Sequence, residues 1–135
     1  MKYILLSLVL LSNLFAEIVV IVNAESKVKT LNSDYAKMIF MKKIKELPNG
    51  EVLIPLDQSS ETDVYTAFYE SVANKSRSRM SQYWAKRVFT GKGEAPEILG
   101  SDEEVIRRVM NNIDSVGYIN AESLVDGVKV VYTIK

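Results

Sequence analysis

The chain has 135 residues and balances 17 Lys and Arg against 17 Asp and Glu, so its formal net charge is zero. A neutral chain lacks the global field that attracts nucleic acid or an anionic membrane, and we expect neither as a partner of the mature chain. The sequence has no cysteine and no histidine, which excludes disulfides, thiolate and imidazole metal sites, and the usual Ser-His-Asp and Cys-His catalytic sets. Catalysis by carboxylates or lysine stays open, but we expect a protein that is not an enzyme, without metal or cofactor.

The N-terminus predicts export. Lys2 precedes a 12-residue apolar run, Ile4–Phe15, and Ala16 then supplies a small residue. The run is shorter than the roughly 20 apolar residues that span a membrane, and it is typical of the h-region of a signal peptide. We expect residues 1–16 to be a cleavable signal peptide, with an uncleaved N-terminal anchor as the alternative. Residues 17–135 should then form one domain that does not insert into the membrane.

The first part of this domain predicts two apolar strands with a helix between them. The β-branched run Glu17–Val22 is typical of a strand buried on both faces, and a helix should follow from about residue 33 to Lys43. A second strand should cover Glu51–Leu56, with Pro55 near its end or at a sheet edge because proline cannot donate to a ladder. This order of elements predicts a βαβ unit with parallel pairing and a right-handed crossover.

The second part predicts three helices and two closing strands. The second helix of this group should end at Gly91, a residue suited to a left-handed helix stop. Ser101 and Glu104 form a capping box that begins the third helix. The expected elements are helices over 61–72, 76–89 and from Ser101 onward, and strands over 116–120 and 128–134.

Five segments in this order carry a resemblance to a known family: EIVVIVN, LNSDYAKMIFMKKIKELPNG, VLIPLDQSSETDVYTAFYESV, QYWAKRVFTGKGEAPE and IDSVGYINAE. Together they resemble the second lobe of the periplasmic phosphate-binding proteins of phosphate ABC transporters, and small single-lobe proteins of that kind are the most similar. The resemblance covers essentially all of residues 17–135. It implies a periplasmic, single-lobe α/β domain of the type II periplasmic-binding-protein fold. Its mixed, mostly parallel sheet should have about four to five strands, flanked by about four helices.

The resemblance also implies where a ligand binds. In the two-lobed relatives the anion lies between the lobes, and one holding segment follows the second strand and reads roughly Arg-x-Asp-Gly-Ser-Gly-Thr. The stretch that corresponds here is LDQSSET, residues 56–62. The resemblance therefore makes Asp57, Ser59, Ser60 and Thr62 the candidate ligand-binding residues.

The same stretch departs from the family pattern. Pro55 stands where the Arg should be, Gln58 and Ser60 replace the two glycines, and Glu61 replaces the Thr. A shift of one residue brings Thr62 into register but does not restore the Arg.

The residues around Ser59 and Ser60 also fit a purely structural role. Their hydroxyls and the free N–H groups of a helix N-terminus make an anion receptor, but either serine would equally serve as an N-cap. Glu61 and Asp63 would stabilise the helix dipole and would repel a phosphate by about 1–4 kcal/mol. The segment therefore predicts an anion site or a capped helix start.

The sequence predicts a non-catalytic periplasmic solute-binding protein for phosphate or another small oxyanion in ABC transport, with a membrane transporter as its partner. The alternative is a single-lobe interaction or sensory module that has lost phosphate binding. Such a module would dock an acidic partner, for example a membrane sensor protein, through the basic stretch from Ser76 to Lys92.

Overall fold

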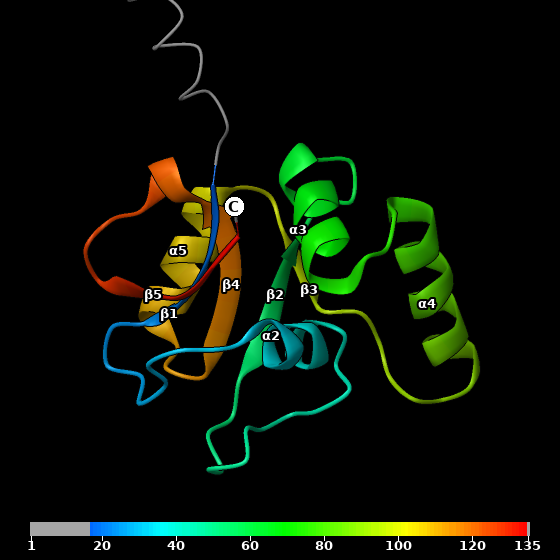
Figure 1. Cartoon of the computed structure of the whole chain (residues 1–135), viewed down its shortest axis with the longest axis horizontal. Helices are drawn as coiled ribbons and strands as arrows, with labels where there is room; N and C mark the ends of the chain where they lie inside the picture. The colour runs from blue at the N-terminus through cyan, green and yellow to red at the C-terminus, as the bar shows by residue number, and fades with distance from the viewer. Residues whose placement is uncertain (1–16, 135) are drawn as a thin grey trace, which may run out of the picture.

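A computed structural model describes residues 17–134 and shows a mixed α/β fold, as the sequence predicts (Figure 1). One five-stranded sheet has the order β3-β2-β4-β1-β5. Its strands are β1 (Ile18–Asn23), β2 (Ile54–Gln58), β3 (Glu97–Leu99), β4 (Ser115–Asn120) and β5 (Val128–Ile134). The helices are α2 (Ser33–Phe40), α3 (Asp63–Ala73), α4 (Arg77–Phe89), α5 (Asp102–Asn111) and the short 3-10 helix η1 (Ala121–Ser123).

The predicted signal peptide, residues 1–16, lies outside the described residues. Within residues 17–134, every helix is too short or too polar to cross a membrane.

The direction of β1 differs from the prediction. β2 pairs in parallel with β3 and with β4, whereas β1 pairs antiparallel with β4 and with β5. The predicted parallel βαβ unit of β1, α2 and β2 is therefore wrong, because β4 lies between the two strands and β1 runs against both. A continuous apolar run specifies burial on both faces of a sheet, but it carries no information on direction or neighbour.

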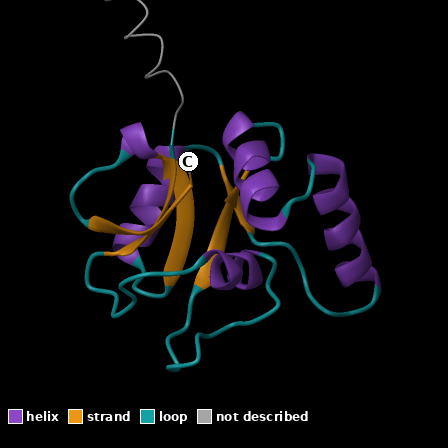
Figure 2. Cartoon of the chain, in the orientation of Figure 1, coloured by secondary structure: helices purple, strands orange, loops and turns teal. Residues whose placement is uncertain are grey.

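Helices cover both faces of the sheet, and each face has its own apolar cluster (Figure 2). On one face α2, α3 and α4 pack over Val20 and Tyr118; on the other, α5 packs alone over Ile21 and Ile119. Alternate residues of β1 enter the two clusters, which is why its sequence is apolar throughout. The described chain is thus a three-layer α/β/α domain built around β1 and β4.

Two helix boundaries differ from the predicted ones, and the hydrogen bonds at the helix ends explain both. α2 ends at Phe40, before the predicted Lys43, because the Lys42 and Lys43 N–H groups bond back to the carbonyls of Ile39 and Met38. This is a Schellman motif, and Lys42 occupies its left-handed position at φ 56°. At α3 the N-cap is Thr62, whose Oγ1 accepts from the Tyr65 N–H at 3.2 Å, and neither Ser59 nor Ser60 caps the helix.

Other predicted ends are confirmed. Gly91 stops α4 at φ 74°, and the Ser101 Oγ accepts from the Glu104 N–H at 3.2 Å at the start of α5. The second strand covers Ile54–Gln58 rather than the predicted Glu51–Leu56, so Pro55 lies near its start and not near its end. The short strand β3 is an addition, because three residues are too few for a periodic pattern.

α5 approaches β4 closely at Gly117. A Cβ on this residue would lie 2.4 Å from the Cγ1 of Val105, which is fully buried. Glycine is thus required here by the packing of a helix against the sheet.

We predict that Gly117→Ala lowers the free energy of unfolding by about 1–3 kcal/mol, because α5 must move away from β4. In a Val105→Ala background, which removes the clashing methyl group, the same change should cost less than about 1 kcal/mol. Urea denaturation of the two single variants and the double variant measures both values. Equal costs in the two backgrounds would contradict the proposed contact.

Candidate functional site

The candidate site lies where β2, β3 and β4 end. These three strands run in the same direction, so their carboxyl ends share one edge of the sheet, beside the start of α3 (Figure 1). Ligands of open α/β sheets bind outside this edge. Asp57 and Gln58 close β2 there, and the loop Ser59–Thr62 leads into α3.

Asp57 is a buried carboxylate shared by three elements. The residue is 3% exposed, and its Oδ1 accepts from the Tyr118 hydroxyl of β4 and from the Gln58 N–H at 3.1 Å. Its Oδ2 accepts from the Tyr69 hydroxyl of α3 at 2.8 Å. Three of about four acceptor positions on the carboxylate are thus used within the protein, and one on Oδ2 is left.

The carboxylate and the tyrosines shift one another's pKa. Burial raises the pKa of Asp57 to about 6, although the hydrogen bonds from Tyr118, Tyr69 and Gln58 act in the opposite direction. Burial, with the Asp57 charge as the next cause, raises the pKa of Tyr69 and Tyr118 well above the ordinary value. At neutral pH the tyrosines therefore remain donors and Asp57 is mostly ionised.

A cavity of about 190 Å³ opens beside this carboxylate, and we call it the β2–α4 cavity. Asp57, Ser60, Tyr65, Arg77, Ser81, Trp84, Ala95 and Ile98 line it. Arg77 opens α4 and brings a permanent positive charge to a wall that also carries three hydroxyl groups. Burial raises the pKa of Tyr65 to about 12, with the Asp57 charge contributing and Arg77 opposing, so both charges act at its hydroxyl.

Trp84 lines the same cavity. The residue is 9% exposed, and its indole Nε1 is buried without a hydrogen-bond partner within residues 17–134. Buried N–H groups are almost always paired, and because this nitrogen has no exposed surface it is not a donor available to a solute in the cavity.

The four sequence-predicted residues separate in space. Asp57 and Ser60 line the β2–α4 cavity, whereas Thr62 lines a different, open hollow of about 530 Å³. Ser59 lines neither of them, and its Oγ accepts from the Glu61 N–H at 3.3 Å, a local turn contact.

The hollow beside Thr62 is acidic. Asp63, Asp102 and Glu103 line it, and Asp102 accepts from Gln58 Nε2 at 2.8 Å and from the Ser123 hydroxyl at 2.7 Å. Asp102 therefore links the start of α5 to Gln58 at the end of β2 and to Asn120 at the end of β4, whose N–H donates to its Oδ2 at 3.1 Å. Within residues 17–134 no group of three or more carboxylates has the arrangement of a metal site.

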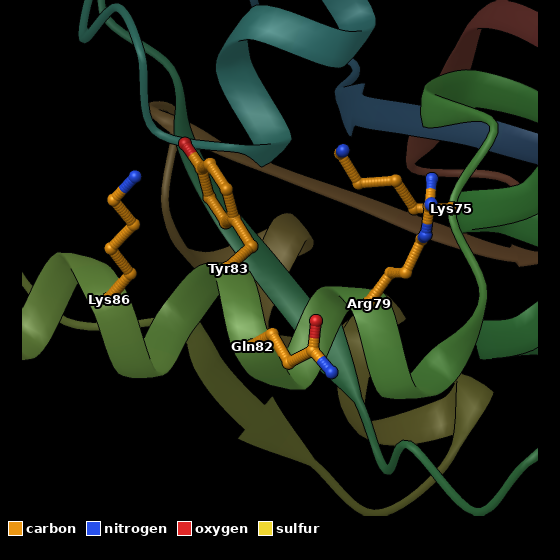
Figure 3. Close-up of a pocket in the computed structure, with 5 residues that line it drawn as sticks. All are labelled: Lys75, Arg79, Gln82, Tyr83 and Lys86. Atoms are coloured by element: carbon orange, nitrogen blue, oxygen red, sulfur yellow. The ribbon is translucent and has the colours of Figure 1, made fainter.

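The basic stretch predicted along α4 is mostly exposed. Figure 3 shows Lys75, Arg79, Tyr83 and Lys86 on one side of this helix, where they border a shallow hollow of about 310 Å³ with Gln82. Only Met80 and Trp84 of α4 are buried. This hollow is separate from the β2–α4 cavity, because the two share no lining residue: Arg77 lines the cavity and does not line the hollow.

Sequence reasoning missed Arg77 and Ser81 as cavity residues, and it favoured core packing over a place in a ligand pocket for Tyr65 and Trp84. The family pattern places the cation at the position of Pro55, within β2, but here the cation comes from α4. Arg77 directly follows the Ser76 cap of a predicted helix, and that position was the available signal.

Solved structures with the same fold give the comparison. A phosphate ABC transporter substrate-binding protein with bound phosphate from Clostridium perfringens matches with a TM-score of 0.69 at 19% identity, over 86% of this chain and 44% of that one. An ABC-type phosphate transport receptor from Vibrio cholerae matches with a TM-score of 0.67 at 15% identity, over 86% of this chain and 45% of that one. PstS from Borrelia burgdorferi matches with a TM-score of 0.64 at 14% identity, over 86% of this chain and 46% of that one.

The fold is that of one lobe of a phosphate-binding protein. No protein-family model matches the sequence, and no curated protein matches it. The chain spans less than half the length of these solved structures. The fold predicted from the sequence resemblance is therefore confirmed, and the lobe's ligand is a separate question.

We predict that Asp57 makes the protein less stable as pH rises from about 4 to about 6. The pKa of Asp57 lies near 3.8 in the unfolded chain and about 6 in the folded one, so the folded state holds a proton that the unfolded state has released. The contribution is present at low pH and is lost as Asp57 ionises in the folded state, by about 3 kcal/mol in all.

Urea denaturation of the protein and of Asp57→Asn between about pH 4 and 7 isolates this effect. The free energy of unfolding of the protein minus that of the variant should fall with rising pH, because only the protein carries the titrating carboxyl. A difference that does not change with pH would contradict a raised pKa for Asp57.

Proposed function

We propose that this protein binds a small oxyanion of the phosphate class, without catalysis, in the β2–α4 cavity. The observation that carries the proposal is the placement of Arg77 and Ser60 around a cavity with the Asp57 carboxylate in its wall. The guanidinium offers paired N–H groups that match two oxygens of one anion. The phosphate found in the Clostridium perfringens structure, which shares the fold, supports this class of ligand.

Asp57 gives the cavity a preference among anions. A carboxylate repels a fully ionised anion, but the remaining acceptor position on its Oδ2 can take a hydrogen bond from an oxyanion that still carries a proton. Phosphate retains a proton at neutral pH and sulfate does not. The Arg77 charge offsets the repulsion, and the hydroxyls of Ser60, Tyr65 and Ser81 complete a set of donors.

One lobe supplies only one wall around the anion. The similar structures are more than twice as long as this chain's matched part, and residues 17–134 supply only the one wall. A half-open site leaves the anion partly hydrated, which weakens charged contacts. We infer weak binding by the isolated protein, and a role beside a membrane transporter, in the periplasm, in which the partner completes the site.

We predict that calorimetric titration of the purified protein detects phosphate binding and that Arg77→Ala weakens it at least about tenfold, because a charged, two-point contact is lost. Arg79→Ala is the matched control, since Arg79 lies on the same helix but lines a different hollow. It should change the dissociation constant less than about twofold.

Sulfate and Asp57→Asn test the preference for a protonated anion. The protein should bind phosphate more tightly than sulfate, and Asp57→Asn should narrow the difference, because an amide does not repel sulfate as a carboxylate does. Absence of heat with millimolar phosphate would overturn the proposal. The exposed basic side of α4 would then favour the alternative, an interaction module for an acidic partner.

A further inference from the structure

A second groove lies at the opposite end of β2 from the anion cavity. It has a volume of about 420 Å³, within the range of small-molecule sites, and an apolar floor that includes Ile44, Val52, Ile54 and Pro55. Val52 is 40% exposed and Ile54 is 55% exposed, although both belong to the approach and start of a sheet strand. Neighbouring exposed apolar side chains of this kind mark binding surfaces.

The rim of this β2-start groove is positively charged. Lys42, Lys45, Arg87 and Lys92 line it, and none of the lining residues is acidic. Within residues 17–134, the ammonium groups of Lys45 and Lys92 make no hydrogen bond and no ion pair, and both residues are exposed. Four cations without a counter-charge repel one another, so an anion held among them is stabilised by all four.

The groove is built in advance by contacts between its walls. Arg87 Nη2 donates to the carbonyl of Lys42 at 3.0 Å and to that of Lys92 at 3.3 Å, and so joins the end of α2 to the loop after α4. Lys42 Nζ donates to the carbonyl of Glu94 at 3.0 Å. These contacts leave Lys45 and Lys92 as the cations available to a ligand.

We propose that the β2-start groove binds a single-chain amphiphile with an anionic head, of the medium-chain fatty-acid class. The alkyl chain lies on Ile44, Val52 and Ile54, where it covers apolar surface that is now exposed. The carboxylate lies between Lys45 and Lys92. This site is independent of the proposed oxyanion site, because Pro55 and Asp57 lie toward opposite ends of β2 and the two cavities share no lining residue.

The test uses decanoate below its micelle concentration, with decylammonium and acetate as probes that change the head charge or remove the chain. Calorimetric titration of the purified protein should give a dissociation constant below about 100 µM for decanoate and at least tenfold weaker binding of the other two. The methyl NMR signals of Ile44 and Ile54 should shift during the decanoate titration. Binding of decylammonium as tight as that of decanoate, or no decanoate binding, overturns the proposal.

Variants locate the site. Ile54→Ser and the double change Lys45→Glu with Lys92→Glu should each weaken decanoate binding about tenfold or more. Leu124→Ser, at an apolar residue that is 43% exposed, and Lys86→Glu, on α4, lie outside the groove and should leave binding unchanged. Equal loss in these controls overturns the proposal.

Two further outcomes would reassign the groove. Displacement of decanoate by inorganic phosphate, or loss of decanoate binding in Arg77→Ala, would place the amphiphile in the oxyanion site and overturn the proposal. A concentration-dependent dimer that Ile54→Ser dissolves would show a second copy of this chain in the groove, with the same consequence. Phosphate binding itself has no bearing on the result, so the two proposals fail separately.

Discussion

A single buried carboxylate determines how the elements of this lobe meet. Asp57 can remain in the interior only because hydroxyls from α3 and β4 and a backbone N–H of β2 bond to it. The two tyrosines that supply those hydroxyls also belong to the aromatic core, in which Phe68 stacks on Tyr118 with ring centroids 4.0 Å apart. The hydrogen bonds to Asp57 and the packing of the aromatic rings therefore require the same position of α3. That position brings Ser60 and Tyr65 to the cavity wall.

Much of the fold is encoded in local patterns of the sequence. β5 has the predicted bounds, α4 begins next to the predicted residue 76, and the cap at Ser101 starts α5 as expected, because cap residues and apolar periodicity act over a few residues. The direction of β1 was predicted wrongly, since strand order depends on contacts between distant segments. β3 was missed because it owes its existence to pairing with β2.

The candidate site was predicted in part for the same reason. Asp57 and Ser60 follow directly from the segment after β2, and both line the cavity. Arg77 belongs to another helix, and its position after Ser76 marks a helix start but does not indicate that α4 will face β2. The tyrosine partners of Asp57 come from α3 and β4, and the buried charge that they stabilise depends on three elements meeting. A charge at a cavity wall is a tertiary property, whereas a helix cap is a local one.

The only tryptophan of the sequence, Trp84, lines the β2–α4 cavity. Its fluorescence therefore comes from one known place. A charged solute that enters the cavity changes the polarity around the ring, and the emission spectrum moves with it. The protein thus carries its own optical reporter of occupancy, which needs no label and does not respond directly to events at the far end of β2.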